Sequence, residues 1–257
     1  MDDITAYLPD AAVVQRAQDG TMPDRTDATA PNMSRAELLM TLGRDREAVA
    51  AAITQHSHVK QQGAPMDGAQ QLDELMPVLH GLVDGISPEQ IDRRTPCTNF
   101  TVGGVLEHMI GGATAFAPLF RGEGQPASPG TTAPTGTLQD RWRAAMADLL
   151  DAVHSDGAAE RIIAAPFGEV PGSVFARFVA FDGLVHGWDL ATATGQRYTP
   201  RDELVREVDA FARQALAPGM RDGDTFAAET EVPAAASVLE QLVAFSGRHV
   251  TNGKATQ

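Results

Sequence analysis

The stretch FARFVAFDGLVHGWDLATATG, residues 175–195, decides the fold of this chain. Its apolar residues recur at helical spacing on two opposite sides, which predicts a central helix over about residues 173–194 that packs on both faces. One stripe contains Phe175, Phe178, Val179 and Val185, and the other contains Val174, Phe181, Leu184 and Trp188. Asp182, His186 and Asp189 occupy interior positions of the first stripe. We therefore expect Asp182 and His186 to be buried.

Buried polar groups of this kind need a partner. An ionised carboxylate without one costs at least several kcal/mol, and a histidine without its hydrogen bonds costs roughly 1–3 kcal/mol. Asp182 and His186 are four residues apart, so their side chains share one face of the helix. They can hydrogen-bond to each other, or they can share a divalent cation, as two histidines do in the His-x-x-x-His motif of zincins. The spacing leaves both interpretations open.

A second segment offers a third metal ligand, His108, at the edge of its own apolar stripe. A lone histidine there is best explained by a bond to a backbone carbonyl, but the stripe that carries Asp182 and His186 shifts the interpretation toward a metal. Four glycines surround it, namely Gly103, Gly104, Gly111 and Gly112. Each costs a helix up to about 1 kcal/mol relative to alanine. They therefore indicate close approach of a neighbouring helix or of a ligand.

Most of the remaining chain has the same helical period. Further helices are predicted from Asp67 through Val83, from Thr101 through Phe120, from Thr137 through Val153, from Thr199 through Ala215, and from Pro233 to a stop at Gly247. Pro77 is expected to kink the first of these or to mark its first turn. Residues 161–172 lack the period and are expected to be extended or a short hairpin. Four long helices with short ones attached predict an all-α fold, a helical bundle.

The first 66 residues differ from the rest. Residues 1–33 contain three prolines among polar residues and are expected to be a tail. Ser34 and Glu37 form a capping box before a predicted helix over about residues 35–56. We therefore divide the chain into an N-terminal extension, residues 1–66, and a helical bundle, residues 67–257. Within the bundle, the Gly/Pro/Ser/Thr-rich run over residues 122–136 predicts a long loop.

Composition excludes several classes of protein. Lys+Arg 20 against Asp+Glu 34 gives a formal charge of −14, which argues against a nucleic-acid partner. No apolar run is long enough to span a membrane, and the first thirty residues lack a signal-peptide pattern, so we expect a cytoplasmic protein. A single cysteine, Cys97, excludes an intrachain disulfide and a Cys-rich zinc site. No phosphate loop and no G-x-S-x-G elbow is present.

Two segments resemble a known family. TPCTNFTVGGVLEHMIGG, residues 95–112, and GEVPGSVFARFVAFDGLVHGWDLATATGQ, residues 168–196, are similar to the signature segments of the DinB-like superfamily, specifically the actinobacterial mycothiol-dependent maleylpyruvate isomerase-like proteins. The resemblance covers roughly residues 69–250. It implies a four-helix bundle and a divalent metal, usually zinc, held by His108, Asp182 and His186. Phe100 stands where members more often carry Trp.

The resemblance also implies a chemistry. Enzymatic members bind the sulfur of a low-molecular-weight thiol such as mycothiol, and zinc favours its thiolate form. This predicts a thiol-dependent transferase or isomerase whose partners are a small-molecule thiol and an electrophilic substrate. The isomerase itself carries an additional C-terminal domain, for which the roughly 60 residues after the second segment are too few. We therefore do not expect that specific isomerase activity.

Several alternatives stay open. The same three residues fit a non-catalytic bundle that holds a structural metal or only a hydrogen-bond network. They also fit metal-assisted hydrolysis, for which Glu107 and Glu169 are candidate bases. Asp189 is expected either to support a metal ligand or to pair with an arginine. Cys97 is either a reactive thiol at a helix N-terminus or a small residue packed in its turn.

Overall fold

The computed structural model describes residues 65–123, 136–165, 168–216, 221 and 227–250. The described α-helices are α3 (Gly68–Asp84), α4 (Val102–Arg121), α5 (Leu138–Val153), α6 (Gly172–Thr194), α7 (Asp202–Ala215) and α8 (Val238–Phe245). A 3-10 turn, η2 (Pro88–Gln90), follows α3, and the strands β1 (Ile162–Ala165) and β2 (Gly168–Pro171) pair between α5 and α6. The sequence predicted the six α-helices, and the hairpin is one of the two forms expected of residues 161–172.

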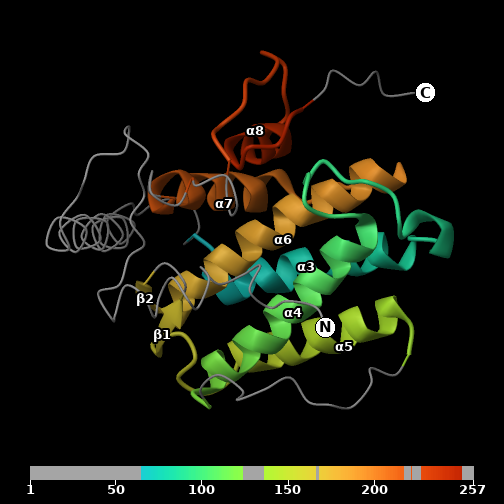
Figure 1. Cartoon of the computed structure of the whole chain (residues 1–257). Helices are drawn as coiled ribbons and strands as arrows, with labels where there is room; N and C mark the ends of the chain where they lie inside the picture. Colours follow the sequence, from blue (N-terminus) through green and yellow to red (C-terminus); the bar gives the residue numbers. More distant parts are fainter. Residues whose placement is uncertain (1–64, 124–135, 166–167, 217–220, 222–226, 251–257) are drawn as a thin grey trace, which may run out of the picture. The chain divides into compact units, whose positions relative to one another are not determined.

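Four of the helices form a bundle. Helix α3 packs on α5 and α6, and α4 packs on the same two helices, so the four close into a ring of contacts. Helix α7 packs against α6, and α8 packs against α7 (Figure 1). This arrangement confirms the expected helical bundle with shorter helices attached.

Helix α6 is the central element of the bundle. Its buried residues lie on all sides of the helix, and Phe181, Leu184 and Leu190 are completely inaccessible to solvent. The opposing core comes from the other bundle helices, for example Leu75 of α3, Leu106 of α4 and Trp142 of α5. The two-sided apolar pattern therefore predicted the position of this helix correctly.

The helix caps confirm some predicted boundaries and correct others. The hydroxyl of Thr101 accepts a hydrogen bond from the Gly104 amide, and Thr137 forms a capping box with Asp140. Helix α3 runs through Pro77, so this proline does not mark its first turn. The cap expected at Thr199 is wrong, because α7 begins at Asp202 without a side-chain cap.

The last helix also begins later than predicted. Ser237 forms a capping box with Glu240, and α8 begins at Val238 rather than at Pro233. A serine side chain accepts from the helix amide, whereas proline has no side-chain acceptor. Gly247 follows the helix with φ of 95°, in the left-handed region that favours glycine, as expected of a stop.

Three predicted segments lie outside the described residues. These are the tail over residues 1–33, the helix over residues 35–56 and most of the loop over residues 122–136. The division of the chain at residue 66 therefore stays a prediction. Among the described residues, no helix is long and apolar enough to cross a membrane.

Candidate metal centre

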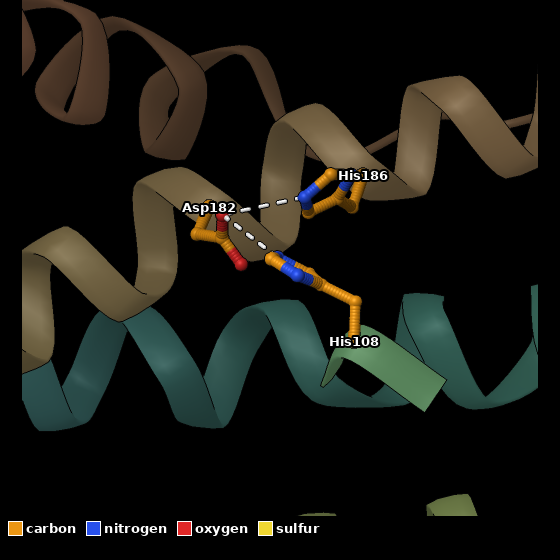
Figure 2. Close-up of side chains that lie close together, drawn as sticks. All are labelled: His108, Asp182 and His186. Carbon is orange, nitrogen blue, oxygen red and sulfur yellow. Dashed lines mark ion pairs between the residues drawn. The ribbon is translucent and has the colours of Figure 1, made fainter. Parts of the chain in front are cut away.

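The structure brings the three predicted ligands together. Helix α6 carries Asp182 and His186 one turn apart, and the neighbouring helix α4 supplies His108. The Asp182 Oδ1 atom lies 3.4 Å from His186 Nε2 and 3.8 Å from His108 Nε2. One ligand atom from each residue can be chosen so that all three lie within 4.8 Å of one another. Figure 2 shows both imidazole rings turned toward the Asp182 carboxylate.

The three side chains differ in exposure, which corrects one prediction. The side chain of His186 is 4% exposed and that of His108 is 10% exposed, whereas that of Asp182 is 40% exposed. The expectation that Asp182 is buried is therefore wrong, although the one for His186 is confirmed. Bundle helices cover the imidazole side of the cluster but leave the carboxylate side accessible. The cluster thus has a closed side and an open side.

A second carboxylate, that of Asp189, contacts the Nδ1 atom of His186, whereas Asp182 faces Nε2. Asp189 is completely buried, and its Oδ2 atom lies 3.0 Å from His186 Nδ1 and 3.0 Å from Arg248 Nη2. An ionised carboxylate only accepts hydrogen bonds, so Nδ1 of His186 must be the donor. In the neutral ring, this leaves the Nε2 lone pair directed at Asp182. The two roles expected as alternatives for Asp189, a partner of the ligand and a partner of an arginine, are both fulfilled.

The donor set fits a divalent cation. Ligand atoms 2.0–2.1 Å from a tetrahedral zinc ion are about 3.3 Å apart, close to the separation of His186 Nε2 and Asp182 Oδ1. That separation is long for a hydrogen bond, and the one to His108 is longer still. When His186 is neutral, Nε2 and Oδ1 are two acceptors that face each other. A cation placed between such groups removes their repulsion.

Electrostatics keep the ligands in the forms that coordinate metals. Partial burial raises the pKa of the Asp182 carboxyl, but the protonated forms of His186 and His108, a hydrogen bond from His108 and the charge of Arg248 outweigh it and lower the pKa to about 2. Burial lowers the pKa of His108 despite its contact with Asp182. At neutral pH, Asp182 is therefore ionised and His108 is neutral, as metal ligation requires.

The loop before α4 adds an aromatic wall to the centre. The ring centroid of Phe100 lies 4.8 Å from that of His108 and 6.2 Å from that of His186. The Thr95 hydroxyl donates to the backbone oxygen of Phe100 or of Cys97, which lie within hydrogen-bond distance, and so ties the two ends of this turn together. Sequence reasoning noted only the aromatic character of Phe100, because its contact with both histidines depends on the folded turn.

Cys97 lies in the same turn but does not belong to the group of ligands. Burial raises the pKa of its thiol, although the positive charge of Arg248 acts in the opposite direction. A raised pKa disfavours the thiolate, which is the nucleophilic form. The structure therefore supports a packed residue in the turn over a reactive cysteine.

Neither proposed hydrolytic base stands beside the centre. Glu107 is exposed and pairs with Arg141 of α5, so its carboxylate is directed toward that helix. Glu169 is exposed on β2, and the first residue of α6, Gly172, is already ten residues from Asp182. Ten helical residues span about 15 Å. Among the residues that the structure describes, the centre therefore has three candidate metal ligands but neither of the bases that hydrolysis was expected to use.

Fold and site together define a DinB-like helical bundle with a candidate His-Asp-His metal centre. Comparison with known families gives a match to the mycothiol maleylpyruvate isomerase N-terminal domain over residues 72–191. The chain belongs to this family, which confirms the resemblance seen in its sequence.

Two curated relatives are each described as an uncharacterised protein of Mycobacterium tuberculosis, from strain H37Rv (ATCC 25618) and from strain CDC 1551 (Oshkosh). Both are 35% identical to this chain over 170 residues, which is 66% of this chain and 91% of each relative. No solved structure matches the chain.

Proposed function

We propose that this chain is a thiol-dependent transferase or isomerase in which His108, Asp182 and His186 hold a divalent cation, zinc in the simplest case. The observation that carries the proposal is a set of three candidate ligands among the described residues, with the open side at Asp182, whose side chain is 40% exposed. Structural zinc sites are usually closed by four protein ligands, whereas catalytic sites keep a position for water or substrate. This favours a reactive centre over a purely structural one.

A cation held there would favour the thiolate over the thiol of a small molecule near neutral pH. The thiol proton leaves to solvent, the sulfur forms a bond to an electrophilic carbon of the second substrate, and a proton from solvent completes the addition. In a transferase the adduct is released, and in an isomerase the carbon–sulfur bond breaks again after rearrangement. Mycothiol is the thiol that the family name suggests.

The chain's own residues have separable roles in this proposal. Asp189 fixes the ring of His186 from its Nδ1 side, so that Nε2 faces the centre. Phe100 covers the imidazoles and limits the access of water to them. Metal-assisted hydrolysis is the weaker alternative, because Glu107 is paired elsewhere and Glu169 is at the far end of α6.

The metal is tested first. Protein is purified without chelator or a histidine tag, and its metal content is measured for wild type, His108→Ala and His186→Ala. His154→Ala is the matched control, because His154 pairs with Asp73 on an exposed surface. We expect a near-stoichiometric divalent metal in wild type and control, and its loss in both ligand variants. A wild type that is empty and takes up no added metal contradicts the proposal.

The thiol is tested on metal-loaded protein. A thiol that binds the folded state raises the melting temperature with its concentration. We expect mycothiol to do so for wild type and the His154→Ala control but not for metal-depleted protein. If the metal is present and no thiol changes the melting temperature, a structural metal is the better explanation.

A further inference from the structure

Arg177 of α6 carries a buried positive charge that the described residues do not pair. Its Nε and Nη2 atoms are inaccessible to solvent and have no hydrogen-bond partner. Among the described arginines, only Arg177 has buried nitrogens of this kind. A guanidinium stays charged in a protein, and a buried donor that lacks an acceptor is costly. Arg177 therefore calls for an acceptor.

The unpaired edge of Arg177 is the one that binds carboxylates elsewhere in this protein. Nε and Nη2 of one guanidinium both contact the same carboxylate in three other places, at Arg143 with Asp84, Arg201 with Glu74, and Arg248 with Asp189. This side-on contact is bidentate and charge-assisted, and it is stronger than a bond between neutral groups. The two free donors of Arg177 thus have the geometry that receives a carboxylate.

Arg177 lies on a different face of α6 from the candidate metal ligands. Asp182 and His186 follow it by five and nine residues, which turns them by about 140° and about 180° around a helix. The Cζ atom of Arg177 instead lies over the ring of Phe211 on α7, 4.5 Å from its centroid. An aromatic face attracts the charge but offers no lone pair to the N–H groups. Phe211 therefore positions the guanidinium without satisfying it.

The nearby carboxylate of Glu207 does not pair with Arg177. Burial lowers the pKa of Arg177, and the charge of Glu207 acts in the opposite direction. The Glu207 Oε2 atom accepts from the Met66 amide at 2.9 Å, and it bonds to neither buried nitrogen of Arg177. The Met66 segment thus binds the carboxylate that stands closest to hand in the chain's own α7.

The start of α3 completes the surroundings of Arg177. A β-carbon on Gly68 would lie 2.8 Å from the backbone nitrogen of Arg177, so the first turn of α3 packs directly on this part of α6. Gln71, one turn further along α3, is completely buried and donates from Nε2 to the Met66 oxygen at 3.4 Å, while its Oε1 atom has no partner. A second polar group of this junction is therefore also left unsatisfied by the protein.

The charge of these surroundings selects the kind of anion. Glu207 is negative and would repel a phosphate dianion more strongly than a singly charged group. A planar carboxylate carries one charge, and its two oxygens match the two donors of a single guanidinium edge. A carboxylate is therefore a better match for this position than a phosphate.

We propose that Arg177 is the anchor of a binding site for a small carboxylate at the junction of α3, α6 and α7. The carboxylate oxygens accept from Nε and Nη2, and Phe211 holds the guanidinium in place. Arg177 as a residue is partly exposed, so the site borders solvent. The inference does not depend on the proposed function, because no metal ligand takes part in it.

Nuclear magnetic resonance of the arginine Nε–H groups tests this site directly. Sodium acetate is the probe, added against sodium chloride at constant ionic strength, and sodium phosphate is the competing anion. Protein is used as purified and after metal depletion, so that coordination of acetate by a metal is recognised. The variants are Arg177→Lys and Arg177→Met. Arg206→Lys is the matched control, because Arg206 pairs with Asp202 on an exposed surface of α7.

We expect the Nε–H signal that is missing from Arg177→Lys to shift with acetate in wild type and to reach saturation, with and without metal. Acetate should also raise the melting temperature of wild type and of Arg206→Lys. Measured by that shift, binding should weaken at least about tenfold in Arg177→Lys, which keeps the charge but loses the bidentate edge, and should be lost in Arg177→Met. Phosphate should bind more weakly than acetate.

A signal of Arg177 that does not saturate with acetate overturns the inference, and so does an acetate response of Arg177→Lys equal to that of wild type. Phosphate binding as tight as acetate binding contradicts the assignment of a carboxylate. A response that disappears on metal depletion also contradicts it, because acetate would then bind at the metal. If Arg177→Met does not fold, the wild-type signal and Arg177→Lys still decide. A protein without metal that binds acetate at Arg177 would remove the proposed function and leave this site standing.

Discussion

The contact between Asp189 and His186 gives the sharpest prediction for the metal centre. Asp189→Asn keeps the size of the side chain but leaves one oxygen where the carboxylate has two. Asp189 Oδ2 lies 3.0 Å from both His186 Nδ1 and Arg248 Nη2, and Oδ1 lies 3.5 Å from Arg248 Nε, so the NH2 group of the amide must face either Arg248 Nε or the other two donors. One of these donors therefore loses its partner in a fully buried environment.

The magnitudes follow from what is left unpaired. Breaking a buried ion pair by removing one partner costs about 3–5 kcal/mol, and leaving one buried donor unsatisfied costs about 1–3 kcal/mol. The side chain of Arg248 is 10% exposed, so water compensates only in part. We expect metal-free Asp189→Asn to lose about 3 kcal/mol of its free energy of unfolding. We also expect metal affinity to fall about 10–100-fold, as for other residues that orient a ligand.

Urea unfolding of metal-free protein measures the first quantity, and competition with a chelator of known affinity measures the second. Asp148→Asn is the matched control, because Asp148 pairs with Arg121 on an exposed surface where its side chain is 54% accessible. The control should change stability by at most about 1 kcal/mol and leave metal affinity unchanged. Metal affinity within about threefold of wild type in Asp189→Asn would refute the orienting role, even if stability falls.

Three further predictions concern Tyr198, which packs against Gly187 next to the candidate ligand His186. Gly187→Ala should cost about 1–3 kcal/mol of unfolding free energy, because the new β-carbon would overlap the Tyr198 hydroxyl and approach Leu79 Cδ2 at 2.8 Å. Urea unfolding measures this loss, and an unchanged free energy of unfolding would contradict the packing. Tyr198→Phe should be neutral or stabilising by up to about 1 kcal/mol, because the buried hydroxyl has no hydrogen-bond partner among the described residues. Burial raises the pKa of Tyr198, so above about pH 10 the unfolded chain releases this proton while the folded chain retains it. Above about pH 10, the free energy of unfolding of wild type should therefore fall relative to that of Tyr198→Phe. If the two proteins show the same dependence of this free energy on pH, burial does not hinder the ionisation of Tyr198.

Much of the fold was predictable because the helices are strongly patterned. The two-sided apolar character of α6 identified the central helix, and the Thr101 and Thr137 caps marked the starts of α4 and α5. The predicted starts failed where proline was given more weight than a side-chain cap, as at Pro233, since α8 begins after Ser237. A proline restricts its own backbone, but it does not satisfy the free amides of the helix.

The three candidate ligands were predictable for a different reason. Polar residues at interior positions must be compensated, and the apolar stripes place Asp182, His186 and Asp189 at such positions and His108 at the edge of one. The family resemblance then singled out His108, Asp182 and His186 as the ligands. The partner of Asp189 could not be predicted in the same way. Arg248 is 59 residues away in the sequence and follows the last described helix, so no local period connects the two. The sequence indicated that Asp189 needs a partner such as an arginine. That this partner is Arg248 depends on how the end of the chain after α8 packs.

The exposure of Asp182 shows where helical periodicity stops being informative. The period of α6 says which side of the helix faces the bundle, but it does not say whether neighbouring helices close over that side. Closure depends on the elements that pack around α6, of which α4 brings His108 Nε2 to 3.8 Å from Asp182 Oδ1 and still leaves the carboxylate 40% exposed. A buried Asp182 would have fitted a structural metal or a hydrogen-bonded pair. Its accessible carboxylate, beside two covered imidazoles, instead fits the proposed function, in which a small molecule approaches the centre from that side.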